Sequence, residues 1–163
     1  PDLKNKRILD LGSNNGCLPL MMLKEGAADV IGMELSREFF EQSQLVRELF
    51  QWRDMEEYAF KAINTDMYDI INSDLGRFDI VTSFCTLYYL KEKQMEAVVR
   101  RASEISSFFV IQANTIAGST WDSDKPRRAS VEFLNNLLIN NGFSDVEIKA
   151  PPLSTRPLLI GVA

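Results

Sequence analysis

The sequence predicts an α/β fold in three layers, with helices on both faces of a seven-stranded, mostly parallel sheet whose last strand is antiparallel. Short apolar runs alternate with segments of helical periodicity along most of the chain, which is typical of βαβ units. The last two strand-like runs have no helix between them, so we expect a hairpin that reverses the final strand. The chain of 163 residues, 45% hydrophobic and 25% charged, has the composition of one globular domain.

Each expected strand is a short apolar run followed by turn residues or by the start of a helix. The first reads RILDLG and ends in a glycine, and the second reads ADVIGMEL. The third, FKAIN, is the weakest of the set, and the fourth, FDIVTSF, is strong. The expected strands cover residues 7–12, 28–35, 60–64, 78–84, 108–113, 146–149 and 158–162.

The expected helices fill most of the gaps between these strands. In the segment 91–105 the apolar residues share one helical face. Ser36 and Ser130 precede two further helices as N-cap residues, and Gly142 follows the last helix as a stop signal. The expected helices cover residues 16–25, 36–53, 68–72, 91–105 and 130–140.

Composition excludes several kinds of site. The chain has no histidine and two cysteines, Cys17 and Cys85, which are far apart in sequence. Zinc sites built from Cys and His, and Ser-His-Asp or Cys-His triads, are therefore excluded, and we expect no metal site. The net charge is −5 and the basic residues are scattered. Because a phosphate backbone favours clustered Lys and Arg, nucleic acid is not expected to bind this domain alone.

We expect residues 1–163 to form a single domain. No apolar run approaches the ~20 residues that span a bilayer. The opening residues lack the charged-then-apolar pattern of a signal segment, so we expect a cytoplasmic protein without membrane contact. The chain opens at Pro1, shortly before the first strand. We therefore expect the domain to be part of a longer chain, with fusion to further domains left open.

The turn after the first strand reads LDLGSNNG over residues 9–16. Gly12 allows the chain to leave the strand in a tight turn, and Gly16 allows the next helix to start close beneath a ligand. That helix presents free N–H groups and a partial positive charge. The pattern is typical of a nucleotide-binding turn. A strand–turn–helix junction without a ligand is the alternative.

Glu34 ends the second strand, where an acid can accept two hydrogen bonds from a ribose diol. Capping of the next helix is the alternative interpretation. A dinucleotide site needs the spacing G-x-G-x-x-G, but Asn14 and Cys17 stand at the second and third glycine positions. This departure, together with the terminal hairpin, disfavours a nicotinamide-dependent oxidoreductase.

The runs DLGSNNG and VIGMELS resemble the first two motifs of class I S-adenosylmethionine-dependent methyltransferases, whose first motif is usually acid-x-Gly-x-Gly-x-Gly. The resemblance covers essentially the whole chain, because the expected strand order and terminal hairpin also match. Asn14 replaces the middle glycine, as in some members, including those resembling tRNA wobble-uridine methyltransferases. The resemblance implies a Rossmann-like methyltransferase fold and S-adenosylmethionine as cofactor.

The resemblance also implies a role for the residues that match its motifs. Asp10 and the loop 12–16 would contact the methionine part of the cofactor, and Glu34 the ribose hydroxyls. Asp66 matches the acid that accepts the adenine amine, with capping of a short helix as its alternative, and Met67 matches an apolar shelf against the ring. The expected cofactor-binding residues are Asp10, Gly12, Ser13, Asn14, Gly16, Glu34, Leu35, Asp66, Met67, Ser83 and Phe84.

Two segments supply substrate candidates. Related small-molecule enzymes often have aromatic residues shortly after the fourth strand, so Tyr88 and Tyr89 are candidates, with aromatic packing as the alternative. The connection 114–128 is long and leaves the edge of the sheet where ligands bind. The candidates in this connection are Trp121, Arg127 and Arg128. The two arginines could bind a carboxylate or phosphate of the substrate. The alternative is a solvated loop without a role in binding.

These features favour an S-adenosylmethionine-dependent methyltransferase acting on a small-molecule acceptor at oxygen or carbon. The fourth strand ends in SFC, without the acid-Pro-Pro-aromatic motif of many base and amide N-methyltransferases. A tRNA or nucleotide methyltransferase and a non-catalytic binding module remain as alternatives. No catalytic residue is singled out; without histidine, a base would be Asp, Glu, Lys or Tyr. Since family members usually carry a lid before the first strand, we expect an open cleft and little turnover from residues 1–163 alone.

Overall fold

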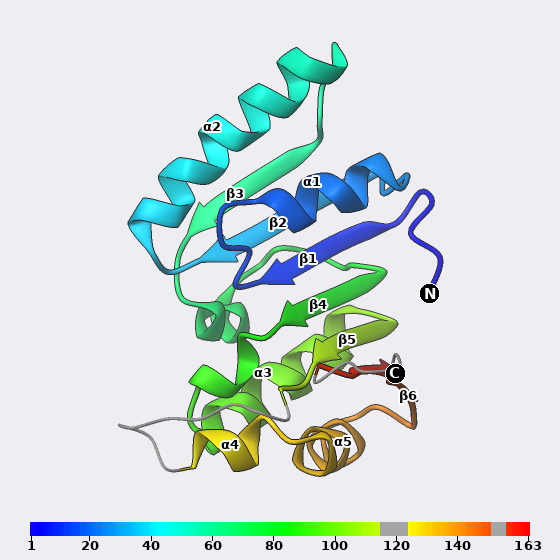
Figure 1. Cartoon of the computed structure of the whole chain (residues 1–163). Helices are drawn as coiled ribbons and strands as arrows, with labels where there is room; N and C mark the ends of the chain where they lie inside the picture. The colour runs from blue at the N-terminus through cyan, green and yellow to red at the C-terminus, as the bar shows by residue number, and fades with distance from the viewer. Residues whose placement is uncertain (115–123, 151–155) are drawn as a thin grey trace.

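The computed structural model describes residues 1–114, 124–150 and 156–163. It contains a 7-stranded sheet in the order β3-β2-β1-β4-β5-β7-β6 (Figure 1). The first five strands are parallel to one another, and β7 is antiparallel to both β5 and β6. The strands are β1 (Arg7–Leu11), β2 (Asp29–Glu34), β3 (Phe60–Asn64), β4 (Ile80–Phe84), β5 (Phe108–Gln112), β6 (Asp145–Lys149) and β7 (Leu158–Val162).

Helices pack on both faces of this sheet, and short 3₁₀ turns follow two of its strands. The α-helices are α1 (Cys17–Lys24), α2 (Arg37–Asp54), α3 (Glu92–Ile105), α4 (Lys125–Arg128) and α5 (Val131–Asn140), and the 3₁₀ turns are η1 (Met67–Asn72) and η2 (Leu87–Tyr89). The expected three-layer fold with an antiparallel last strand is confirmed. The sequence did not predict η2 or α4, each of which is too short to show a helical period.

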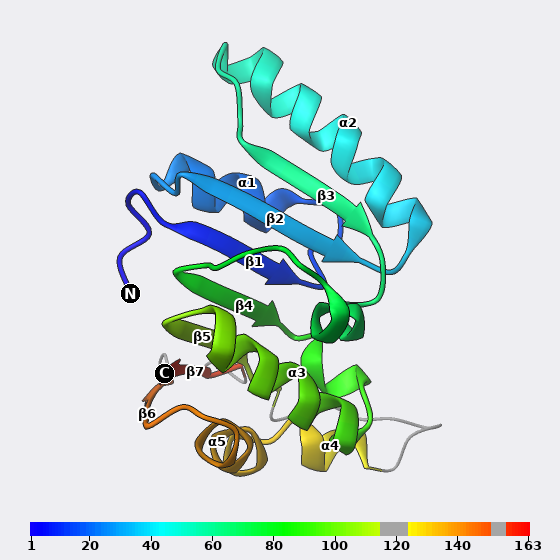
Figure 2. The same cartoon turned by 180° about the vertical axis from the view of Figure 1, so that it is seen from behind.

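The alternation of apolar residues along β1 separates two cores. Leu9 and Leu11 face the layer that contains α3 and α5, whereas Ile8 faces the layer that contains α1. Figures 1 and 2 show these two layers from opposite sides, with α2 beyond the edge strand β3. The predicted N-caps also form: the side chains of Ser36 and Ser130 accept hydrogen bonds from backbone N–H groups in the first turns of α2 and α5.

The carboxyl ends of the parallel strands meet at one edge of the sheet. The chain leaves β1 toward β2 on one side, whereas β4 lies on the other side of β1. This reversal of strand order creates a crevice between the loops that follow β1 and β4. Both 3₁₀ turns and α4 lie at the same edge (Figure 1). Within the described part of the chain, no helix has the length and apolar character needed to cross a membrane.

Candidate active site

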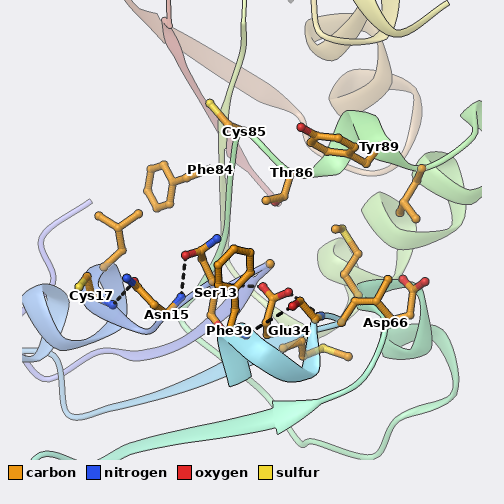
Figure 3. Close-up of a pocket in the computed structure, with 18 residues that line it drawn as sticks. Ser13, Asn15, Cys17, Glu34, Phe39, Asp66, Phe84, Cys85, Thr86 and Tyr89 are labelled. Carbon is orange, nitrogen blue, oxygen red and sulfur yellow. Dashed lines mark hydrogen bonds between the residues drawn. The ribbon is translucent and has the colours of Figure 1, made fainter. Parts of the chain in front are cut away.

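A cavity of about 810 Å³ opens at this edge of the sheet (Figure 3). Its size is within the range of small-molecule and cofactor sites. Its walls come from the loops after β1, β2, β3 and β4 and from the first turns of α1 and α2. The lining residues are Gly12, Ser13, Asn14, Asn15, Cys17, Leu18, Met33, Glu34, Leu35, Ser36, Phe39, Asp66, Met67, Phe84, Cys85, Thr86, Tyr89 and Leu90.

The loop after β1 is held in a left-handed turn over the end of β2. Gly12 and Gly16 have φ angles of 82° and 78°, and Asn14 has a φ of 51°. Asparagine tolerates this conformation better than most residues, which explains how Asn14 can occupy the middle glycine position of the resembled motif. The backbone N–H groups of Gly12 and Ser13 both donate to the Met33 carbonyl, at 2.8 and 3.0 Å. These bonds fix the floor of the cavity.

Glu34 is 9% exposed and its two carboxylate oxygens each accept one backbone hydrogen bond. The N–H of Asn14 donates to Oε2 and the N–H of Ser36 to Oε1, both at 2.8 Å. Each carboxylate oxygen can accept a further bond, so the carboxylate still has acceptors for a diol in the cavity. Glu34 therefore supports the start of α2, as the alternative interpretation proposed, and also lines the cavity.

Asp66 also combines a capping role with a place in the cavity wall. Its Oδ1 accepts a hydrogen bond from the Tyr68 N–H at 2.9 Å and thereby caps η1. The capping alternative is thus present in the structure, and the second carboxylate oxygen remains an acceptor for a ligand. Met67 lies beside it in the wall, and Leu35, 67% exposed, lies at the rim. Figure 3 shows Asp66 and Glu34 on the same side of the cavity.

Asp10 lies in the sheet, and it is not among the described residues that line the cavity. It is 2% exposed, and its Oδ1 accepts a hydrogen bond from the Thr82 hydroxyl at 2.7 Å. Burial is the main cause that raises the pKa of Asp10 from 3.8 to about 6; the nearby Glu34 carboxylate adds to the effect and the Thr82 bond opposes it. The Asp10 side chain is therefore used within the sheet, in its bond to Thr82 of β4.

This pKa shift predicts a measurable effect of pH on stability. Because the folded state binds the Asp10 proton more tightly than the unfolded state, the contribution is favourable at low pH and is lost as the pH rises through about 6. Replacing Asp10 with Asn, which cannot ionise, removes this loss. From pH of about 4.5 to about 7.5, the free energy of unfolding of the variant should gain ~2 kcal/mol relative to the parent. Urea unfolding across this range measures the gain, and a constant difference between the two proteins would refute it.

The end of β4 forms the wall opposite Glu34. Phe84, Cys85 and Thr86 line the cavity there, and Cys85 has a left-handed φ of 60°. The Thr86 hydroxyl donates to the Leu11 carbonyl at 2.6 Å and lies 2.8 Å from the Ser83 hydroxyl. Ser83 is fully buried and its side chain is occupied by this contact, so it stands behind the described cavity wall. Ser83, which the sequence predicts at the cofactor, is thus absent from the described cavity wall, whereas Thr86, which lines it, has no signal in the sequence.

The two tyrosines of η2 point in different directions. Tyr89 is 60% exposed and lines the cavity, whereas Tyr88 is 2% exposed and packs in the core. Burial and a hydrogen bond to Cys85 raise the pKa of the Tyr88 phenol. The expectation that both tyrosines face the substrate is therefore corrected for Tyr88, because a 3₁₀ turn rotates consecutive residues by about a third of a circle.

The basic residues of α4 also differ from expectation. Arg127 donates to Glu92 at 2.6 Å and lies in a second, smaller cavity beside α5. Arg128 is 6% exposed and donates to the Tyr88 carbonyl. The structure thus corrects the prediction of a substrate anion at Arg128, whose side chain is buried, whereas the half-exposed Arg127 stays a predicted site for such an anion. Trp121 lies outside the described residues.

Several cavity residues have no signal in the sequence alone. Leu18 and Phe39, which are 45% and 37% exposed, come from the first turns of α1 and α2. Gly16, which the sequence predicts at the cofactor, is the N-cap of α1 and is not among the described lining residues; a Cβ there would lie 2.7 Å from Cε1 of Phe60. The apolar residues of both helices predict core packing by their period, and only the three-dimensional position of the first turn shows that they reach the crevice.

The cavity thus combines a glycine-containing turn, an acid after β2 and an acid after β3 on the edge of a mostly parallel sheet. This arrangement is that of a nucleotide-type cofactor site in a Rossmann-like domain. Residues 8–106 match the family model of the methyltransferase domain. The chain belongs to this family, and its fold is shared with solved methyltransferase structures.

Known proteins with related sequences and structures agree with this family. The chain is 28% identical over 104 residues to a ubiquinone biosynthesis O-methyltransferase of Neisseria meningitidis serogroup C, covering 64% of this chain and 41% of that protein. It spans well under half the length of the curated relatives it matches.

Two solved structures share the fold at low identity. Magnesium protoporphyrin IX methyltransferase from Synechocystis PCC 6803, determined with S-adenosylmethionine, superimposes with a TM-score of 0.71 at 17% identity and covers 99% of this chain and 71% of that chain. A methyltransferase from Mesorhizobium loti, dependent on S-adenosylmethionine, gives 0.72 at 16% identity over 100% of this chain and 93% of that chain.

Proposed function

We propose that the protein transfers a methyl group from S-adenosylmethionine to an oxygen or carbon atom of a small-molecule acceptor. The observation that carries this proposal is the continuity of one cavity, which joins Glu34 and Asp66 on one wall to the end of β4 and Tyr89 on the other. An acceptor at the second wall would share the cavity with a cofactor held at the first.

The residues present fit this cofactor. Glu34 offers acceptors for the ribose hydroxyls, and Asp66 and Met67 offer an acceptor and an apolar surface for adenine. Gly12 and Asn14 would bring loop backbone against the methionine part. When bound, S-adenosylmethionine supplies an electrophilic methyl group on a sulfonium. The task left to the protein is to align the two reactants and exclude water, which accounts for a large part of the rate of such displacements.

The proton of an oxygen or carbon acceptor also needs a destination. The carboxylates among the described cavity residues are Glu34 and Asp66, and both lie on the cofactor side. The chain has no histidine. An acceptor that is acidic by itself, such as a phenol or an enol, would need the least help. The proposal therefore favours acceptors of this type.

The end of β4 supports oxygen or carbon over an amide nitrogen. An amide or base NH₂ group needs acceptors at the reacting end, but the Ser83 hydroxyl is taken by Thr86, and the Cys85 thiol donates to Gln112 at 3.1 Å. The net charge of −5 supports a small acceptor over a nucleic acid. The proposal includes a cytoplasmic location, which the two free thiols, Cys17 and Cys85, fit.

A metabolite screen with isotopically labelled S-adenosylmethionine, run on the full-length protein, tests the acceptor. We expect label in a small acidic hydroxyl or carbon compound. Label confined to transfer RNA or to an amide nitrogen would overturn the acceptor assignment while leaving the cofactor assignment intact. A protein that binds S-adenosylhomocysteine but labels neither class would point to the binding-module alternative.

A further inference from the structure

Lys125 contacts the ring of Tyr89, which is one of the residues that line the cavity. Lys125 is the first residue of α4, which packs against η2 at the carboxyl edge of the sheet (Figures 1 and 2). The Lys125 ammonium nitrogen lies 3.6 Å from the centroid of the Tyr89 ring and 5.7 Å from that of Tyr88. Tyr89 itself lines the cavity. Lys125 therefore places a positive charge beside the wall formed by η2.

Lys125 differs from the other two basic residues of α4 in its interaction partners. Arg127 is paired with Glu92, and Arg128 is buried against the Tyr88 carbonyl. Within residues 1–114, 124–150 and 156–163, no carboxylate forms a salt bridge with Lys125, and its interaction partners are the two tyrosine rings. A ring face attracts an ammonium group, but it does not take up the three N–H donors as carboxylate oxygens would. The Lys125 ammonium group therefore keeps donors for a ligand.

We propose that Lys125 binds an anionic oxygen group, a carboxylate or phosphate, on the methyl acceptor. Lys125 is half-buried, so the charge is partly removed from water and held in place by the Tyr89 ring. The described cavity wall carries two carboxylates, Glu34 and Asp66, which would repel an acidic acceptor. The Lys125 charge, next to Tyr89 of the opposite wall, would offset that repulsion for an anionic acceptor bound near Tyr89. This inference rests on the proposed function and narrows its substrate class to anionic acceptors.

The test uses binding of matched small probes to the full-length protein, with and without saturating S-adenosylhomocysteine. Benzoate and phenyl phosphate carry the anion, and benzamide is the neutral counterpart of benzoate. We expect the parent protein to bind at least one anion about tenfold or more tightly than benzamide, the range of a charge-assisted hydrogen bond. Comparison of the two anions separates a carboxylate site from a phosphate site.

Three variants assign this preference to Lys125. Lys125→Met should abolish it, Lys125→Arg should retain most of it, and Lys93→Met, which removes an exposed lysine from the first turn of α3, should leave it unchanged. Affinity for S-adenosylhomocysteine should be the same in all four proteins. For an acceptor found by the metabolite screen, Lys125→Met should raise KM about tenfold to a hundredfold and leave kcat nearly unchanged.

Several outcomes would overturn the inference: equal binding of anions and benzamide by the parent, no binding of either anion, or a preference that survives in Lys125→Met. A screen that returns only neutral acceptors would also overturn it, while the proposed methyl transfer to a small molecule stands. If the proposed function is wrong, the metabolite screen finds no methylated small molecule, while binding of the anionic probes still depends on Lys125.

Discussion

Replacing Glu34 with Gln is expected to weaken S-adenosylhomocysteine binding by about a hundredfold, or ~3 kcal/mol, the range of two hydrogen bonds to a charged group. Both oxygens of Glu34 accept a backbone N–H, from Asn14 and from Ser36. A glutamine amide has one oxygen, so its NH₂ group must face one of these donors. The substitution therefore removes an acceptor from the cofactor and also loosens the loop that holds it.

Calorimetric titration of the two proteins with S-adenosylhomocysteine measures this loss. Glu38→Gln is the matched control, because Glu38 is an exposed carboxylate in the first turn of the same helix. The control should bind as the parent does, and urea unfolding should show that the Glu34 variant is folded. Unchanged affinity in the folded Glu34 variant would mean that this carboxylate does not contact the ligand.

The sequence predicts that Glu34 and Asp66 come together in one cavity, because both stand at or just after strand ends. Glu34 is the last residue of β2, and Asp66 follows the last residue of β3, Asn64, by two positions. In a parallel sheet, residues at the carboxyl ends of successive strands must gather at one edge, whatever the detail of their loops. The Gly12 and Gly16 positions are predictable for the same reason, since both have the left-handed φ that the turn requires.

The acceptor side is less predictable because it depends on short turns whose residues have no period. Tyr88 and Tyr89 are adjacent in sequence, and η2 sends one into the core and the other into the cavity. The three basic residues of α4 likewise have different surroundings. Arg128 is buried, Arg127 forms a salt bridge with Glu92 of α3, and Lys125 contacts the Tyr89 ring. These partners are distant in sequence, so the sequence alone does not predict which of the three cations lies beside a cavity residue.

The largest loss of stability among the glycines of the cofactor loop is expected for Gly12→Ala. Gly12 has a φ of 82°, and a Cβ there would lie 2.6 Å from Cγ2 of Thr86. Thr86 cannot turn away without breaking its hydrogen bond to the Leu11 carbonyl. We expect a fall of about 4 kcal/mol in the free energy of unfolding, from the left-handed backbone together with overpacking, and loss of S-adenosylhomocysteine binding as the loop shifts.

Gly26→Ala separates these two causes. Gly26 has a φ of 97°, but the nearest atom to a Cβ there is 3.6 Å away, so the substitution meets backbone strain without a clash. We expect a fall of about 1–2 kcal/mol for this control, the cost of a left-handed non-glycine residue, with cofactor binding retained. Urea unfolding measures both variants. Equal losses would show that the contact with Thr86 adds nothing, and that Gly12 is required by its backbone conformation alone.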